Sequence, residues 1–258
     1  MTEGAAISAV RPSLKDESWR YADGEFLAGA DLAVLTNWHE HEVPAGEIER
    51  GFATLSPSDV QGGQVDRLRV HVGKGARYEH FVVNAAGPYA RCELDVTLEE
   101  GAHFELGGGT LGGGDMRQEI VTRVVHAANA TSNQVVRAVQ WGRSTGNFLG
   151  RIEIPRHAQK VDSAQNFRAI LLEAGASANA KPELEIYADD VKAAHGAAIG
   201  ALDAQAGFYM ASRGIPPHVA RKLLVRAFIA DAFAAIGDDE VREDMLEQAL
   251  HFLEGADL

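Results

Sequence analysis

Short runs in which apolar and polar residues alternate fill the sequence from about residue 55 to residue 203. In RLRVHV (67–72), Leu68, Val70 and Val72 alternate with charged or polar neighbours, as in a strand buried on one face. Comparable runs are ARYEHFVV (76–83), ARCELDVTL (90–98), QEIVTRVVH (118–126), NQVVRAVQW (133–141), GRIEIP (150–155) and NFRAILL (166–172). Many short strands indicate a mainly β fold. The pattern alone leaves a sandwich, a barrel and a β-solenoid open, because no regular short repeat is evident.

The pattern becomes helical after Gly200. Residues 204–212 are predicted to form a helix that ends by Gly214, and Pro216-Pro217 suit the first turn of a second helix running to about residue 236. Gly237 ends that helix and Asp238 caps a third. The apolar sides predicted to pack are Leu223, Leu224, Ala227 and Phe228 on the second helix, and Met245, Leu246, Ala249, Leu250 and Leu253 on the third.

Two glycine clusters interrupt the β region, at 107–109 and 112–114. In GGGTLGGGD no Gly-Lys-Ser/Thr opens a helix, so the stretch lacks the sequence of a phosphate-binding P-loop. A flexible turn between two strands is the simpler interpretation. We therefore expect both clusters to lie in a turn.

The first 45 residues are mixed in character. A polar segment around 16–19 has helical potential, and Trp19 and Tyr21 are expected to act as ordinary packing aromatics. In WHEHE, an extended backbone places His39 and His41 on one face. Two imidazoles fall short of the three or four ligands of a zinc site, so solvated histidines are expected.

Composition excludes several classes of function. The 258 residues carry a net charge of −13, which disfavours binding to nucleic acid or an anionic membrane. Neither an apolar run long enough to span a bilayer nor a signal-peptide pattern is evident, so a cytoplasmic protein is expected. The single cysteine, Cys92, permits no internal disulfide, and it cannot hold an iron–sulfur cluster alone.

The stretch from Lys181 to Gly214 resembles the closing motif of the SufB/SufD family of iron–sulfur cluster assembly proteins. The resemblance rests on LEIYADDVK, AHGA, GALD and FYMASRGI within that stretch, and on KDESWRYA (15–22), TGNFLG (145–150) and AQKVDSAQNF (158–167) elsewhere. KDESWRYA favours the SufD branch. The resemblance implies a right-handed parallel β-helix core (46–203), a C-terminal helical subdomain (204–258) and a short N-terminal extension (1–45), shorter than is typical of the family.

The resemblance also implies a role and a site. A SufD-like chain is a non-catalytic scaffold that pairs with a SufB-like chain and docks a SufC-like ABC ATPase through its C-terminal helices. His195 corresponds to the family histidine that lies at the SufB interface and takes part in nascent cluster assembly. Ala193 replaces a cysteine common in the family, so His195 is the one metal ligand expected from this chain, and no tightly bound cofactor is expected. Residues assigned to partner contacts are Tyr187, Asp189, Asp190, Lys192, Ala193, Gly196, Arg213, Gly214, Leu223, Leu224 and Phe228.

Two other functions are compatible with the residues. A β-helix enzyme acting on polysaccharides would need clustered carboxylates, and Asp189-Asp190 is the nearest candidate. Neighbours in a strand point to opposite faces, however, which favours a turn or a polar network. A homodimer without a cluster role is the second alternative, because an unpaired strand edge invites self-pairing. The sequence lacks nucleophile-elbow, HExxH, CxxC and dinucleotide motifs.

Overall fold

The computed structural model describes residues 10–56 and 62–253, and its core is two parallel β-sheets of six strands each. The odd-numbered sheet contains, in spatial order, β1 (His39–Val43), β3 (Gln64–Val72), β5 (Tyr89–Leu98), β7 (Arg117–His126), β9 (Thr145–Ile154) and β11 (Ser177–Ile186). The even-numbered sheet contains β12 (Lys192–Gly200), β10 (Asp162–Leu171), β8 (Thr131–Gln140), β6 (His103–Gly112), β4 (Arg77–Asn84) and β2 (Ile48–Leu55). Successive strands alternate between the sheets, so the chain winds through about six turns of a parallel β-helix.

This arrangement confirms the expected β-helix and decides between the three architectures that the alternation left open. It also extends the β region toward the N-terminus, because β1 and β2 precede the point near Leu55 where regular alternation begins. The sequence of β1, HEHEV, is mostly polar, since this strand lies at the edge of its sheet and only Val43 in it is buried.

The space between the two sheets is filled mainly by apolar side chains. Inward-facing residues of consecutive turns stack on one another, as do Val70, Val96 and Val124 in the odd sheet, which are all fully buried. Phe148 on β9 and Phe167 on β10 stack across the interior with ring centroids 5.7 Å apart. Burial of this continuous column supplies most of the apolar stabilisation of the β-helix.

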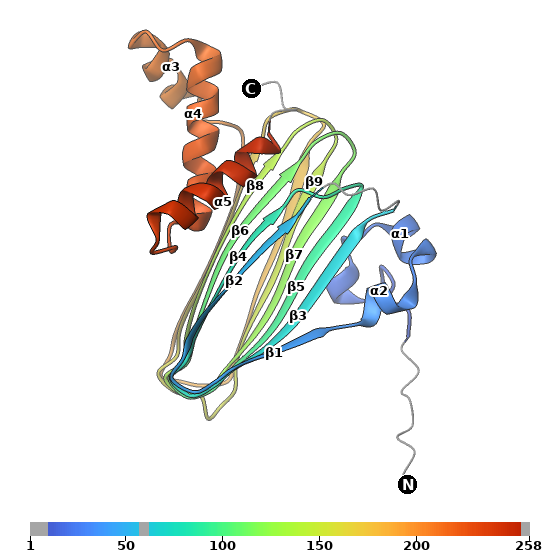
Figure 1. The fold of residues 1–258 in the computed structure, drawn as a ribbon, viewed down its shortest axis with the longest axis vertical. Helices are drawn as coiled ribbons and strands as arrows, with labels where there is room; N and C mark the ends of the chain where they lie inside the picture. Colours follow the sequence, from blue (N-terminus) through green and yellow to red (C-terminus); the bar gives the residue numbers. More distant parts are fainter. Residues whose placement is uncertain (1–9, 57–61, 254–258) are drawn as a thin grey trace.

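Two groups of helices lie on opposite outer faces of the β-helix (Figure 1). Outside the odd sheet are η1 (Glu17–Trp19), α1 (Gly24–Gly29) and α2 (Leu32–Thr36). The C-terminal group contains α3 (Ala204–Ser212), α4 (Pro217–Ala230), η2 (Asp231–Phe233) and α5 (Asp239–His251). Asp238 caps α5 by accepting hydrogen bonds from the backbone of Glu240 and Val241, as the sequence predicts. Of the C-terminal elements, α4, η2 and α5 pack on the even sheet, whereas α3 extends away from it.

The prediction that Gly107–Gly109 forms a turn is wrong. These glycines lie inside β6, where the C-terminal segment approaches the strand directly. A Cβ atom on Gly107 would lie 2.1 Å from the backbone oxygen of Ala232 and 2.7 Å from the ring of Phe81. Only glycine therefore leaves room for η2 at this position. Of the second cluster, Gly112 ends β6, and Gly113 and Gly114 do enter a turn.

The predicted packing face of the second helix is partly wrong. Val225 and Ile229 are fully buried against the even sheet, together with Ala220. Leu224 and Phe228 are half-buried, but Leu223 and Ala227 are exposed. The sheet is thus covered by a face of α4 rotated from the predicted one. For the third helix the prediction is confirmed for Met245, Leu246 and Ala249 on α5 and for Leu253 just after it, which are all buried, while Leu250 is half-buried.

Candidate functional site

The last turn of the β-helix leaves two strand edges without partners. β11 ends the odd sheet and β12 ends the even sheet, so one row of backbone N–H and C=O groups on each faces away from the fold. Large apolar side chains are exposed at the same place: Ile186 (38%), Tyr187 (66%) and Ile199 (45%). An uncovered edge beside exposed apolar residues is a surface suited to adding strands from another chain.

His195 lies in the middle of this last turn, on β12. Its register partner on β10 is Gln165, so both side chains are on the inward face of the sheet. His195 is nevertheless exposed, because no further turn covers it. Within residues 10–56 and 62–253 its ring has neither a hydrogen-bond nor an ion-pair partner. Its neighbours Ala193 and Gly196 are small, so the ring is accessible.

Asp189 and Asp190 lie in the bend between β11 and β12 rather than in a strand, and both are exposed. The backbone N–H of Asp190 donates to Gln159 Oε1 at 2.9 Å, and its carbonyl accepts from Lys160 at 2.6 Å. This pair therefore shapes the turn at the end of the β-helix. Lys192, also exposed, begins β12 beside it.

The hairpin of α3 and α4 presents a second exposed surface. No residue of α3 is buried, and Phe208 (78%) and Tyr209 (58%) are among the most exposed large side chains of the described chain. Gly214, with φ of +85°, ends α3, and the guanidinium of Arg213 lies 5.2 Å from the ring of Tyr209. The sequence predicts partner contacts at Arg213 and Gly214, but it does not predict the exposure of the two aromatic side chains. The signal that could have identified them is an adjacent pair of large aromatic residues on a helix that buries no residue in the fold.

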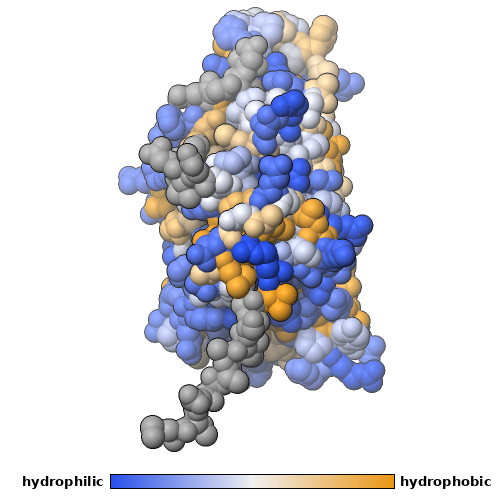
Figure 2. Space-filling view, turned by 90° about the vertical axis from the view of Figure 1, so that its right-hand side faces the viewer, coloured by the Kyte–Doolittle hydropathy of each residue, from blue (hydrophilic) through white to orange (hydrophobic). Residues whose placement is uncertain are grey.

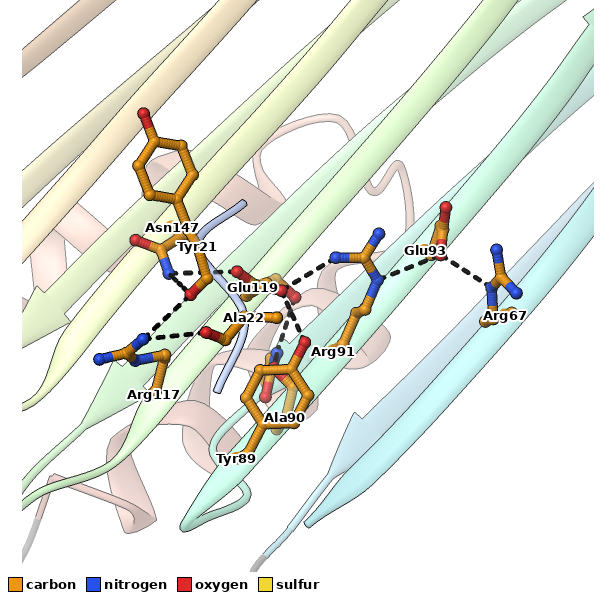
Figure 3. Close-up of polar contacts among 11 residues, drawn as sticks. Tyr21, Ala22, Arg67, Tyr89, Ala90, Arg91, Glu93, Arg117, Glu119 and Asn147 are labelled. Atoms are coloured by element: carbon orange, nitrogen blue, oxygen red, sulfur yellow. Dashed lines mark hydrogen bonds and ion pairs between the residues drawn. The ribbon is translucent and has the colours of Figure 1, made fainter. Parts of the chain in front are cut away.

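A buried network of charges joins the N-terminal segment to the odd sheet (Figure 3). Arg91 is fully buried and donates to Glu119 at 2.9 Å and to Glu93 at 3.1 Å. The ring of Trp19 lies 3.9 Å from the Arg91 guanidinium, and Tyr89 donates its hydroxyl to Glu119 at 2.7 Å. Trp19 is thus a packing residue, as expected, that covers a buried cation.

The same segment is also held through its backbone. Arg117 donates to the carbonyl oxygens of Tyr21 and Ala22, and Asn147 donates to that of Tyr21. At the far end, Lys181 on β11 pairs with Glu17. The KDESWRYA motif therefore spans the outer face of the odd sheet, and it reaches the strand that borders the open turn. The side that carries it is largely hydrophilic, apart from small apolar patches (Figure 2).

A cleft of about 440 Å³ lies between this segment and the odd sheet, and its lining contains the clustered carboxylates that a β-helix enzyme would need. Its carboxylates are paired: Glu93 with Arg67 and Arg91, Asp95 with Arg69 and Arg123, and Glu183 with Arg151 and Lys181. Burial alone would raise the pKa of Glu93, but the guanidiniums of Arg91 and Arg67 outweigh burial and lower it. That carboxylate is therefore unsuited to act as the general acid of a glycosidase.

The histidines of WHEHE lie at the opposite end of the β-helix. His39 is exposed, and His41 Nε2 lies 2.9 Å from Glu49 Oε2. Across residues 10–56 and 62–253, no three His, Cys, Asp or Glu side chains are placed to hold a metal ion. Cys92 is buried, and burial raises the pKa of its thiol, so it is not an available ligand. Neither described range contains a helix long and apolar enough to cross a membrane.

The fold is that of a parallel β-helix protein whose last turn carries two open strand edges and an exposed histidine. Comparison with known proteins assigns this fold to a family. The family described as "SUF system FeS cluster assembly, SufBD core domain" matches residues 52–228. Because this match covers more than half of its length, the chain belongs to the SufBD family.

Individual relatives are moderately similar. A SufBD family protein of Synechocystis is 33% identical over 161 residues (62% of this chain, 36% of the relative). The iron–sulfur cluster assembly protein SufD of Escherichia coli is 35% identical over 115 residues (45% and 27%). A SufBD family protein of Mycobacterium tuberculosis is 32% identical over 195 residues (71% and 49%). The chain thus spans no more than about half the length of these relatives.

Proposed function

We propose that this chain is a non-catalytic, SufD-like scaffold subunit of the SUF system that pairs through its last turn with a SufB-like chain. The observation that carries the proposal is the pair of uncovered strand edges on β11 and β12. A partner with a matching open turn would satisfy the backbone groups of both strands and cover Ile186, Tyr187 and Ile199. Small residues on β12, such as Ala193 and Gly196, would allow the two chains to approach closely.

In this proposal His195 is a ligand to a nascent iron–sulfur cluster, which is cargo rather than a resident cofactor. The ring is exposed, and among the described residues its nitrogens have no hydrogen-bond or ion-pair partner. It therefore suits the role of a single exchangeable ligand. Clusters are usually held by several thiolates, with histidine replacing some of them. Since Ala193 provides no thiolate, the remaining ligands would come from the partner chain.

The C-terminal hairpin is the proposed docking surface for a SufC-like ABC ATPase. Phe208, Tyr209 and Leu223 are exposed on α3 and α4. A groove of about 540 Å³ runs between α4 and α5, where Leu223 and Ala227 lie beside Arg226 and Glu243. Exposed aromatics at the tip of a rigid helical pair are typical anchors of protein interfaces. α4 itself is fixed to the sheet through Val225 and Ile229, so movement of the ATPase would be transmitted to the β-helix.

The experiment is co-expression with the SufB-like and SufC-like chains of the same organism, followed by light scattering of the purified complex. The full chain should yield a complex with the mass of all three components. A chain in which Phe208 and Tyr209, both exposed, are replaced by serine should lose the ATPase but keep the SufB-like chain. His195→Ala should leave assembly intact and abolish cluster formation. His39→Ala is its matched control, because His39 is an exposed, inward-facing histidine on the edge strand at the opposite end.

One alternative outcome has support in the structure. The same open edges would also accept a second copy of this chain. If the chain purifies as a dimer of itself beside both candidate partners, the scaffold proposal is wrong and the homodimer is the better account.

A further inference from the structure

The helical hairpin of α3 and α4 is basic, although the chain as a whole has a net charge of −13. Residues 204–230 contain four Lys or Arg side chains and neither Asp nor Glu. The four cations are Arg213, Arg221, Lys222 and Arg226. A net charge far from zero already keeps a protein soluble, so solubility does not explain a patch of the opposite sign.

Three of these four cations make no ion pair in the part of the chain that the structure describes. Arg226 is the exception, because it pairs with Glu243 on α5. Arg213 and Lys222 are exposed to solvent. Arg221 is half-buried, and its guanidinium donates to a backbone carbonyl rather than to a carboxylate. The hairpin therefore carries positive charge that the fold does not neutralise.

The β-helix contains a comparable stretch without acids, but its arginines are all neutralised. Residues 120–152 also contain four arginines and neither Asp nor Glu. Each of these arginines is ion-paired with a carboxylate from elsewhere in the chain, as Arg143 is with Asp115 and Arg137 is with Asp231. An absence of acids in the local sequence thus does not by itself leave cations unpaired in this fold.

The acids at the two ends of the hairpin are engaged by other groups. Asp203 caps α3 by accepting hydrogen bonds from the backbone of Gln205 and Ala206. Asp231, which follows α4, pairs with Arg137 on the even sheet. Neither carboxylate is therefore available to the free cations of the hairpin.

Cations lie beside the exposed apolar side chains of the hairpin. The guanidinium of Arg213 lies 5.2 Å from the ring of Tyr209. Lys222 directly precedes Leu223 on α4, and Arg226 lies one turn further along the same side of that helix. Protein interfaces typically bury apolar anchors at their centre and place polar and charged groups at their rim. The hairpin presents this combination, with a rim of one sign.

We propose that the hairpin docks in an acidic groove of the ATPase, where apolar contacts fill the centre and carboxylates at the rim face Arg213 and Lys222. This inference rests on the proposed function, which names the ATPase but not the chemistry of its surface. Opposite charges across an interface steer association and fix the orientation of the partners, and salt screens their attraction.

An anionic bilayer would also attract these cations, at about 1 kcal/mol for each Lys or Arg near its surface, but the neighbouring helix disfavours it. α5 packs beside α4 in the same apolar cluster (Figure 1). It exposes five carboxylates, those of Asp239, Glu240, Glu243, Asp244 and Glu247. An extended anionic surface would repel them, whereas a groove on a protein can confine its negative charge to the region of α3 and α4.

The test is calorimetric titration of the isolated full chain with the ATPase of the same organism, at about 50 mM and about 500 mM salt. The double variant Arg213→Gln/Lys222→Gln should bind about fivefold to twentyfold more weakly than the unsubstituted chain at the lower salt concentration. At the higher concentration the difference should shrink to about twofold, because salt screens the lost attraction. Both side chains are exposed, so the variant should fold.

Arg156→Gln/Lys160→Gln is the matched control. It also removes one arginine and one lysine that are exposed and make no ion pair within the described residues, but from the turn between β9 and β10. Its ATPase binding should be unchanged. Equal weakening by the two double variants, or weakening by neither, overturns the inference. Sedimentation with phosphatidylglycerol vesicles that requires Arg213 and Lys222, in a chain that does not bind the ATPase, overturns it in favour of a membrane.

A variant with serine in place of Phe208 and Tyr209 separates the inference from the proposed function. If it loses the ATPase while Arg213→Gln/Lys222→Gln retains full binding, the hairpin remains the docking surface and the acidic groove is rejected. If neither variant alters binding, the docking surface lies elsewhere and both proposals are rejected. The titration requires no SufB-like chain, so its result does not depend on pairing through the last turn.

Discussion

Replacing Gly107 with alanine tests the way the C-terminal helices are attached to the β-helix. The new Cβ atom would lie 2.1 Å from the backbone oxygen of Ala232 and 2.7 Å from the Phe81 ring. Neither atom is the end of a flexible side chain, so η2 or β6 has to shift. Overpacking of this kind costs typically about 1–3 kcal/mol, and the backbone contact places Gly107→Ala at the upper end.

Release of the helices would cost more than this shift. Val225, Ile229, Phe233, Met245 and Leu246 are all buried in the same apolar cluster, to which the even sheet also contributes. Exposing five such side chains costs on the order of 7–15 kcal/mol. The helices should therefore stay docked in a strained position, and the variant should remain folded. At about 2–4 °C per kcal/mol for a chain of this size, Tm should fall by roughly 6–12 °C.

Gly109→Ala is the matched control on the same strand and the same outer face. Its Cβ atom would meet the Phe233 ring at 3.6 Å, which is an ordinary contact. Because alanine also loses less backbone entropy than glycine on folding, this variant should be neutral or gain up to about 1 kcal/mol. The assay is differential scanning calorimetry of both variants. Equal losses of Tm in the two, or none in either, would refute the close approach of η2 to Gly107.

Three further predictions concern other regions. Trp19→Ala should cost about 3–5 kcal/mol in chemical denaturation, because it leaves a cavity over the buried Arg91 guanidinium; a Trp19→Phe variant that loses as much would contradict the role of ring packing. Burial lowers the pKa of His126 to about 4, against 6.5 for the unperturbed residue. The unfolded chain then binds the extra proton, so stability should decline as the pH falls from about 6.5 to about 4, and His126→Gln should make the pH profile flatter in calorimetry. Phe208→Ser should change the free energy of unfolding by no more than about 0.5 kcal/mol and should weaken ATPase binding in calorimetric titration, whereas unaltered binding would move the docking site elsewhere.

The sequence predicted the β-helix class chiefly through its resemblance to a family. Alternation such as that of 67–72 identified strands but not their arrangement, since stacking into turns is a long-range property. No regular repeat was visible because the turns differ in length. The register partners Arg77, His103, Thr131, Asp162 and Lys192 are 26, 28, 31 and 30 residues apart.

The errors have a common physical cause. Gly107 was assigned to a turn because the atom that requires a glycine there belongs to Ala232, far along the chain. The face of α4 was assigned from its apolar content, which includes Leu223 and Ala227, but the sheet is covered by Val225 and Ile229. Long-range contacts of this kind leave no local pattern. The Asp238 cap was predicted correctly because capping involves only neighbours in sequence.

For the site, the sequence identified His195 through its small neighbours and the family motif, but it did not predict that its register partner is Gln165. A glutamine in a strand carries no local signal of burial. The pairing of these two residues depends on the register of β10 and β12, which is a long-range property. The exposed aromatics of α3 were missed for the same reason, since exposure depends on how the helix is placed.

The central claim is that the last turn pairs with a partner chain, and hydrogen–deuterium exchange tests it most directly. Backbone exchange would be compared for the isolated chain and for the chain mixed with its organism's SufB-like protein. Pairing predicts new protection in Ser177–Ile186 and Lys192–Gly200, with no change in β1 and β2 at the opposite end. Protection confined to β1 and β2, or none in either place, would contradict the account.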